Sequence, residues 1–500
     1  MLAVSLLASD RDSASPNNYS LPFAEPHTIT LLVVGSFIYL LNVIYELFQF
    51  LFGAGLVGQL ILGAIYCVPL GNIIPIDIQT SIGTIGYLGL LLLIVEGGLG
   101  TRLDILSERD NIILCLLVAT SGICLPIGLS MLVLHFGYQY ALLESFIVGA
   151  ALSATSLGTT IAVMSSFRFS APTSNLQNEV IDLGEPKAFV ASKDERNIGE
   201  TRAGTILMGA AVLDDIVGLV ISSVVANLGS TNHLSPWVIA RPIVSSTAIL
   251  LVTAVLAKYI SPFFISLLTF RSFGSWSGSK WAYQLSNIAL LLFIAVIAAY
   301  ITISHYIGSS MLIGAFCAGS LMSHCWKVIQ ARAEFDAIMH WSPHTSFERI
   351  EPVQTHVLAP LFFASIGAAI PVRALFQATS AWRGILFSAL MVVAKVLPGM
   401  WLPIWATLEQ RLRPHKSVSP VTPSWPAGLF VGLALVTRGE IGLLILNIAQ
   451  GEGLVGEEAF AVGIWAVVLS TLIGPIGVGR LLQTGVANWI IGGTWGLRTG

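Results

Sequence analysis

Two consecutive carboxylates lie in the middle of an apolar segment that is long enough to cross a bilayer. Asp214 and Asp215 stand near the centre of the stretch 203–228. A membrane-spanning helix needs about 20 residues, and one charged residue at its centre costs about 2.5–3.5 kcal/mol on insertion scales. Such a pair persists where it faces a wet cavity or a charged partner, so we favour a functional role over a helix-packing hydrogen bond. The segment therefore predicts a functional site inside the membrane.

Two basic residues lie deep inside other apolar segments. Lys395 falls within 384–407, and Arg438 stands with Glu440 at the centre of 427–450. Adjacent residues on a helix point about 100° apart, because 3.6 residues make one turn. One aspartate can therefore pair with a cation on another helix while its neighbour faces a cavity.

Thr155 and Ser156 belong to a run of small and hydroxyl-bearing residues inside a further apolar segment. The run, Ser-Ala-Thr-Ser-Leu-Gly-Thr-Thr at 153–160, lies in the centre of 141–166. Hydroxyl side chains compete with the backbone hydrogen bonds of a helix, and glycine weakens it further. The run fits close helix packing through small residues and equally a broken helix whose freed carbonyls surround an ion. By itself it favours neither interpretation.

The composition indicates which kind of structural elements hold these residues in place. Of the 500 residues, 55% are hydrophobic and only 10% are charged, whereas a soluble protein has about 25% charged residues. Apolar segments follow one another along almost the whole chain, so we expect an all-α polytopic protein in a lipid bilayer. A net charge of −3 gives no indication of nucleic-acid binding, and the five cysteines lack metal-ligand spacing. The sequence calls for no cofactor.

The apolar segments predict about thirteen transmembrane helices. The expected division is a polar N-terminal tail at 1–30, a transmembrane domain at 31–482 with core helices at about 111–228 and 355–482, and a short C-terminal tail at 483–500.

The basic residues predict the orientation in the membrane. With the N-terminus outside, inner loops hold most of the 24 lysines and arginines, and only Arg11, Arg373 and Arg383 lie in outer segments. This is the bias of the positive-inside rule. An odd number of spans then puts the N-terminus outside and the C-terminus in the cytoplasm. The longest polar stretch, 168–202, falls on the inner side, where we expect a mobile loop insertion.

Two more loops are predicted. One, at 261–281, is rich in serine and glycine, and the other covers 324–352. The second holds His324, His340 and His344, which we interpret as solvated residues because their spacing is not that of a metal site.

Polar interruptions recur at matching places in the two halves of the chain. In the first half the interrupted fifth span precedes the acidic sixth, and in the second half the span with Lys395 precedes a twelfth span that is interrupted at 437–440. Matched interruptions are a sequence pointer to an inverted-repeat transporter with a site at the membrane midplane. We therefore expect inverted repeats and two crossed, broken helices, the fifth and the twelfth.

Taken together, these segments resemble the monovalent cation/proton antiporters, and within them the second, paired-Asp branch with its thirteen-helix Na⁺/H⁺ antiporters. The resemblance runs from about residue 56 to 482. The motifs that carry it are Ala-Ala-Val-Leu-Asp-Asp-Ile-Val-Gly at 210–218, Ala-Thr-Ser at 154–156, Leu-Phe-Phe-Ala-Ser-Ile-Gly at 361–367, Lys395, and Thr-Arg-Gly-Glu-Ile-Gly-Leu at 437–443. The long loop at 168–202 suggests a eukaryotic, fungal member.

The resemblance implies a homodimer that exchanges Na⁺ or Li⁺ for H⁺ by alternating access. It implies that Asp215 binds the cation and protons in turn, and that Asp214 pairs with Lys395. Arg438 and Glu440 would stabilise the broken twelfth helix and its surroundings.

The residues themselves suit such competition. Hard cations prefer oxygen ligands, which Asp215, water and hydroxyls such as those of Thr155 and Ser156 can provide. A carboxylate in a partly desolvated cavity also holds a proton more tightly than one in water.

Other functions remain open at this point. K⁺/H⁺ exchange is the alternative within the family, because the motif chemistry does not fix Na⁺ over K⁺. An intramembrane aspartyl protease is a remote alternative, since its two carboxylates usually come from two helices and the chain has no Gly-x-Gly-Asp segment. A channel would need a filter such as Thr-Val-Gly-Tyr-Gly, which is also missing. The sequence thus predicts a transporter and not an enzyme, in a plasma or organelle membrane.

Overall fold

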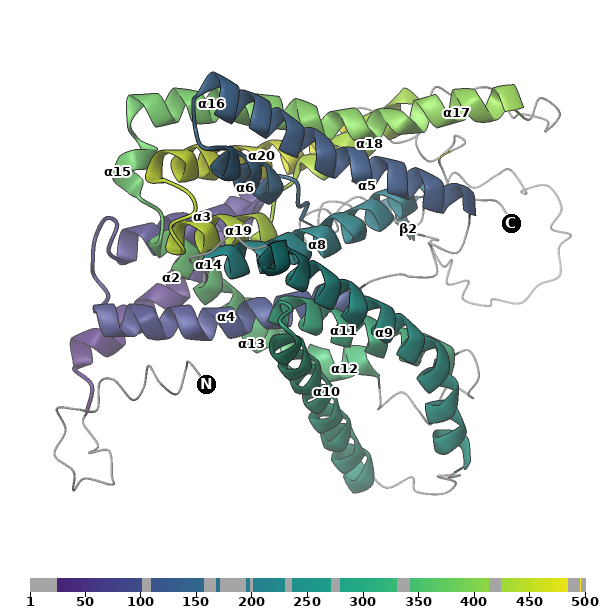
Figure 1. Cartoon of the computed structure of the whole chain (residues 1–500). Helices are drawn as coiled ribbons and strands as arrows, with labels where there is room; N and C mark the ends of the chain where they lie inside the picture. Colours follow the sequence, from purple (N-terminus) through teal and green to yellow (C-terminus); the bar gives the residue numbers. More distant parts are fainter. Residues whose placement is uncertain are drawn as a thin grey trace, which may run out of the picture.

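The chain is almost entirely helical where its structure is described (Figure 1). The computed structural model describes residues 25–100, 109–156, 168–170, 195–197, 201–229, 236–270, 279–330, 342–412, 424–483 and 495. The bounds of the elements are α2 (Thr28–Phe52), α3 (Gly55–Tyr66), α4 (Ile76–Leu99), α5 (Arg109–Ser130), η3 (Met131–Gly137), α6 (Leu142–Ala151), β1 (Arg168–Ser170), β2 (Glu195–Asn197), α8 (Arg202–Gly229), α9 (Pro236–Phe270), α10 (Ser279–Ile307), α11 (Met311–Gln330), α12 (Pro343–Glu348), α13 (Glu351–Val353), η7 (Gln354–Leu358), α14 (Ala359–Ala368), α15 (Val372–Leu375), α16 (Ala378–Val396), η8 (Leu397–Met400), α17 (Trp401–Leu412), α18 (Trp425–Val436), α19 (Glu440–Gly451) and α20 (Glu457–Gln483).

Nine helical spans in the described part of the chain are long and apolar enough to cross a membrane. The polytopic membrane architecture that the composition predicts is therefore confirmed. The other four predicted spans coincide with the shorter helices α3, α6 and α14 and with α11. The count of thirteen and the orientation of the termini stay predictions.

All three of the predicted loops contain regular structure. In the loop expected at 324–352, α11 continues to Gln330, α12 covers Pro343–Glu348 and α13 begins at Glu351. The sequence explains part of this error, since Trp326, Val328 and Ile329 continue the apolar pattern of α11.

The loop expected at 261–281 is mostly helical, because α9 continues to Phe270 and α10 begins at Ser279. The sequence explains the error, since residues 262–270 are still apolar and the serines and glycines gather only after Arg271. At the ends of the segment 168–202, β1 and β2 form a two-stranded antiparallel sheet, so this part departs from an all-α fold. The predicted mobility concerns mainly residues 171–194, which lie outside the described residues.

The helices form two groups that meet along α8 and α19. The first group comprises α5, α6, α8, α16, α18, α19 and α20, with α16 packed along α20 and α5 against α8. The second comprises α2, α3, α4, α9, α10, α11 and α14, with α4 packed against α11 and α14. In Figure 1 α5, α16 and α20 of the first group lie in the upper part of the molecule, and α4, α10 and α11 of the second lie in the lower part. Contacts of α8 with α9 and of α19 with α14 join the two groups.

Glycines allow α18 to approach the end of α16 closely. A Cβ atom on Gly432 would lie 2.5 Å from the carbonyl oxygen of Val396, and one on Gly428 would lie 2.7 Å from that of Gly399. Two small residues four apart are the usual means of bringing two membrane helices into backbone contact. This contact fixes the position of Lys395, one residue before Val396, relative to the end of α18.

Candidate ion-binding site

Two helix interruptions meet at the centre of the first group. After α6 ends at Ala151, residues 152–156 are not helical, and three residues separate α18 from α19. The backbone amide of Ser156 donates a hydrogen bond to the carbonyl oxygen of Thr437 over 3.1 Å. The helix α6 therefore ends where the small, hydroxyl-rich run begins, so the run is not only a packing surface. Residues 157–167, where the second half of the fifth span is expected, lie outside the described residues.

The two aspartates come from the uninterrupted helix α8. Asp214 and Asp215 are both buried, with 1% and 8% of their surfaces exposed. The helix lies close to both interruptions: a Cβ atom on Gly218 would lie 3.0 Å from Ile441 and 3.3 Å from Ala154. Gly218 thus lets α8 bring the carboxylates, one turn earlier, beside the broken helices.

Asp214 is held in a fully buried ion pair. The ammonium nitrogen of Lys395 lies 2.8 Å from Oδ2 of Asp214, and neither side chain is exposed. The same nitrogen donates to the hydroxyl of Thr155 at 3.0 Å and to the carbonyl oxygen of Ser153. Thr155 in turn donates to Oδ2 of Asp214 at 2.9 Å. All three N–H groups of the ammonium are thereby used, which lowers the cost of burying this pair.

The charges of Arg438 and Glu440 suit the helix ends beside them. Arg438 is fully buried, and its Nη1 donates to the carbonyl oxygen of Ala154, just after α6. The backbone of Arg438 is held as well, because its carbonyl oxygen accepts a hydrogen bond from the hydroxyl of Thr471 on α20. A cation stabilises the carbonyl ends of α6 and α18, where the helix dipole is negative, and a carboxylate stabilises the amino end of α19, where Glu440 is the first residue.

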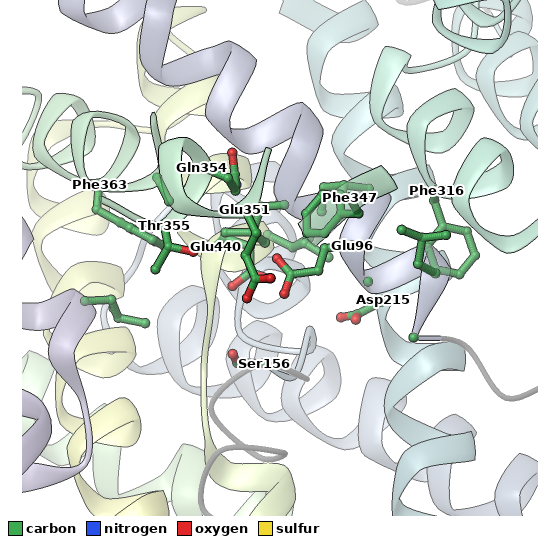
Figure 2. Close-up of a pocket in the computed structure, with 18 of the residues that line it drawn as sticks. Glu96, Ser156, Asp215, Phe316, Phe347, Glu351, Gln354, Thr355, Phe363 and Glu440 are labelled. Carbon is green, nitrogen blue, oxygen red and sulfur yellow. The ribbon is translucent and has the colours of Figure 1, made fainter. Parts of the chain in front are cut away.

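Asp215 faces a cavity of about 580 Å³. Ser156 and Glu440 also line it, together with Glu96 from α4 and Glu351 from α13. Figure 2 shows the carboxylates of Glu96, Glu351 and Glu440 turned toward one another, with Asp215 and Ser156 at the edge of the same space. The cavity is therefore lined by carboxylates from both groups of helices, and it attracts cations.

The structure separates the residues that the sequence pointed to into two sets. Asp215, Ser156 and Glu440 line the cavity, whereas Asp214, Thr155 and Lys395 form the ion pair behind it. Of the two hydroxyl residues, only Ser156 is thus placed where it can contact an ion beside Asp215.

Sequence reasoning missed two acidic residues of the cavity, Glu96 on α4 and Glu351 on α13. Glu96 lies three residues before the end of α4, and a glutamate inside an otherwise apolar span was the available signal. Glu351 gave no signal, because it falls within the polar loop predicted at 324–352. His344 is exposed, as expected of a solvated residue, but it stands beside the cavity because α12 packs its Phe347 against Phe293.

Comparison with known proteins identifies the family. Residues 33–484 match the family described as "Sodium/hydrogen exchanger, transmembrane". The chain belongs to this family. It is therefore a multi-pass membrane transporter that exchanges ions, and not an enzyme, so the protease alternative falls away.

Individual relatives of this exchanger agree with the assignment. The high-affinity Na⁺/H⁺ antiporter NhaS3 of Synechocystis is 24% identical over 401 residues, which cover 79% of this chain and 70% of the relative. The Na⁺/H⁺-K⁺ antiporter GerN of Bacillus cereus is 24% identical over 426 residues, 84% of this chain and 87% of the relative. Among solved structures, the sodium proton antiporter MjNhaP1 of Methanocaldococcus jannaschii shares the fold, with a TM-score of 0.59 at 15% identity over 91% of this chain and 99% of that one. The fungal origin stays a prediction.

Proposed function

We propose that this exchanger moves Na⁺ against H⁺ with Asp215 as the shared carrier of both ions. One observation carries this assignment: the ion pair occupies Asp214, whereas Asp215 faces the cavity. Oδ1 of Asp215 is buried and accepts no hydrogen bond from any residue that the structure describes. A buried carboxylate oxygen without a donor is poorly stabilised when charged, so it gains from binding either a proton or a metal cation. Because one carboxylate cannot hold both, the two ions exclude each other.

The further ligands of the cation are oxygen atoms beside Asp215. The hydroxyl of Ser156 lines the same cavity, and water enters with the ion. Na⁺ and Li⁺ both suit such a set. K⁺ is the competing substrate, and the name of GerN includes it, whereas NhaS3 is named for Na⁺ alone.

The direction in which the cavity opens follows from the topology that the basic residues predict. The end of α4 near Glu96 precedes an inner loop, and Glu351 lies at the end of another, 324–352. The state described here is then open toward the cytoplasm. Alternating access requires a second state in which Asp215 meets the opposite side.

We further propose that the exchanger is a homodimer. Apolar side chains of α2, such as Leu32 and Phe50, are exposed on the outside of the second group of helices. Lipid or a second copy covers such a surface, and light scattering of the purified protein distinguishes one copy from two.

The substitution Asp215→Asn tests the carrier assignment. In proteoliposomes with an entrapped pH dye, proton flux driven by Na⁺, Li⁺ or K⁺ should be lost, because a neutral amide neither binds the cation nor exchanges a proton. The matched control is Asp77→Asn, at an exposed carboxylate in the first turn of α4, which should keep the wild-type flux. Strong Na⁺-driven flux from correctly folded Asp215→Asn protein would refute the assignment, and faster exchange with K⁺ than with Na⁺ in the wild type would reverse the ion preference.

A further inference from the structure

Trp495 is buried against the helices of the first group although it lies twelve residues beyond the end of α20. Only 3% of its surface is exposed. It belongs to an apolar cluster to which α5, α8, α17, α18 and α20 contribute, through residues such as Leu114, Ala203, Leu402, Phe430 and Leu482. A tryptophan at this distance from the last helix thus completes a core that five helices share.

The backbone of Trp495 also caps the helix that carries the two aspartates. Its carbonyl oxygen accepts a hydrogen bond from the amide of Ala203 over 3.1 Å. Ala203 lies in the first turn of α8, where amide groups have no partner within the helix. The segment after α20 thereby supplies an acceptor that α8 itself lacks.

Arg202 extends this contact to two more helices. Its guanidinium lies 4.8 Å from the centre of the Trp495 ring, within the range of a cation–π interaction. The same side chain donates to Oδ1 of Asn111 on α5 at 3.2 Å, and it lies 3.9 Å from the carboxylate of Glu409 on α17. Trp495 is therefore one member of a network that fixes where α8 begins.

The start of α8 is mechanically linked to the ion site. Twelve residues separate Ala203 from Asp215, about 18 Å along an uninterrupted helix. Such a helix shifts as a unit. A displacement at its first turn is therefore felt by the hydrogen bonds of Asp214 with Lys395 and Thr155, and by the position of Asp215 in the cavity.

We propose that the ends of α5, α8, α17, α18 and α20 form a docking site for the segment that follows α20, with Trp495 as its anchor. Occupation of this site fixes α8 in the position in which Asp214 meets Lys395 and Asp215 faces the cavity. The docked segment is thus an internal ligand that sets the cation affinity of the exchanger. The link to cation affinity rests on the proposed function of Asp215, whereas docking itself does not.

Binding in trans tests the docking site without reference to transport. A chain that ends at Gln483 is titrated into a fluorescein-labelled peptide of residues 484–500, and fluorescence anisotropy is measured. The peptide should bind saturably, and a peptide with Trp495→Ala should bind at least about tenfold more weakly, as expected when an anchor tryptophan is removed. Absence of saturable binding by a shortened chain that keeps a cooperative thermal unfolding transition, or equal binding of the two peptides, would overturn the docking site.

Variants of the full chain test the effect on α8 and do not depend on the shortened chain folding. Trp495→Ala should lower the melting temperature by several degrees and raise the Na⁺ concentration for half-maximal exchange by about fivefold, within the usual range of coupling between sites. Trp495→Phe keeps a ring and should retain most of both values. The control is Trp237→Ala, at a tryptophan that is two-thirds exposed at the start of α9.

Each outcome has one meaning. A Trp495→Ala protein with the melting temperature and Na⁺ dependence of the wild type rejects the proposal as a whole. A lowered melting temperature with unchanged Na⁺ dependence rejects the link from docking to the ion site. If Asp215→Asn should remain active, the carrier assignment fails while the peptide titration still decides on docking.

Discussion

Gly439 and Ser156 approach each other more closely than two side chains would allow. A Cβ atom on Gly439 would lie 2.6 Å from Cβ of Ser156 and 2.8 Å from its hydroxyl oxygen. The backbone of Gly439 is extended, with φ −137° and ψ −156°, so any residue could adopt this conformation. Glycine is needed here because of space, since the two helix breaks touch only while position 439 carries no side chain.

Gly439→Ala should therefore reduce exchange strongly. The added methyl group moves Ser156 away from its place beside Asp215, and overpacking of this kind costs about 1–3 kcal/mol of stability. We expect the rate of Na⁺-driven proton flux to fall at least about tenfold, measured in proteoliposomes at equal protein content. Gly451→Ala at the other end of α19, where a Cβ atom meets nothing within 4 Å, should leave the rate unchanged. Equal rates for the two variants would show that contact of the breaks is not required.

Lys395→Gln should destabilise the protein. Removal of one partner from a buried ion pair costs about 3–5 kcal/mol, because the other charge is left uncompensated. Thermal unfolding should show a clearly lower melting temperature, and Asp214→Asn in addition should restore part of the loss. The control is Lys258→Gln, at an exposed lysine of α9, with little effect. If the double variant loses more melting temperature than the two single variants together, Lys395 and Asp214 do not stabilise each other.

The same variant tests whether Lys395 takes part in charge movement. If a cation at the site breaks the pair with Asp214, Lys395 can release a proton and the cycle moves net charge, worth about 2.3 kcal/mol per charge per 100 mV. Capacitive currents of reconstituted Lys395→Gln on a supported membrane should then be reduced or lost relative to wild type. Full currents would assign the lysine a purely structural role.

Glu351→Gln should weaken cation uptake modestly. Glu351 lines the cavity and is exposed, so its charge raises the local cation concentration without holding the ion directly. The Na⁺ concentration for half-maximal exchange should increase by about two- to fivefold at low ionic strength, and the difference should shrink at high ionic strength because salt screens exposed charges. Asp77→Asn, at the far end of α4 from Glu96, should show no such change. A salt-independent effect would indicate that Glu351 contacts the ion.

Residues 171–194 should be dispensable for exchange. Ser170 and Glu195 lie opposite each other in the pair of β1 and β2, so a linker of about four glycine and serine residues can close the hairpin. The shortened protein should retain Na⁺-driven proton flux, although its pH optimum can shift. Replacement of the whole stretch 168–202 should be harmful, because Arg202 binds Asn111 and Trp495. Loss of flux in a folded protein that lacks only 171–194 would place the loop in the transport path.

The sequence was informative where the residue type alone makes burial in the membrane energetically costly. Asp214, Lys395 and Arg438 are charged residues in apolar segments, and each of them requires a partner or a cavity. The breaks near Ser156 and Gly439 were also visible, because hydroxyl and glycine residues weaken a helix locally. The all-α fold, and the expectation that the site lies where the polar interruptions of the two halves meet, follow from such local signals.

Relationships between distant segments were visible only where charges in apolar segments had to be paired, as for Asp214 and Lys395. Nothing in the composition near Glu351 indicates that it faces Glu96 and Glu440, because that depends on how the two groups of helices pack. Burial of Trp495 follows from a contact with Ala203, almost 300 positions earlier, and no periodicity links the two. The continuation of α9 past Ser261 was missed for a local reason, since the serines and glycines after Arg271 outweighed the apolar run 262–270.

The volume of the cavity affects how the exchanger can distinguish its ions. A space of about 580 Å³ admits a cation together with its coordinated waters, since one water takes about 30 Å³ in the liquid. A space of this volume does not by itself separate Na⁺ from K⁺ by size. With Asp215 and Ser156 as the proposed ligands, discrimination occurs when the last waters are exchanged for their oxygens, so it depends on the difference in dehydration free energy between the two ions. Ion preference is then concentrated in a few atoms at the break, where a single substitution can change it while the route of entry stays the same.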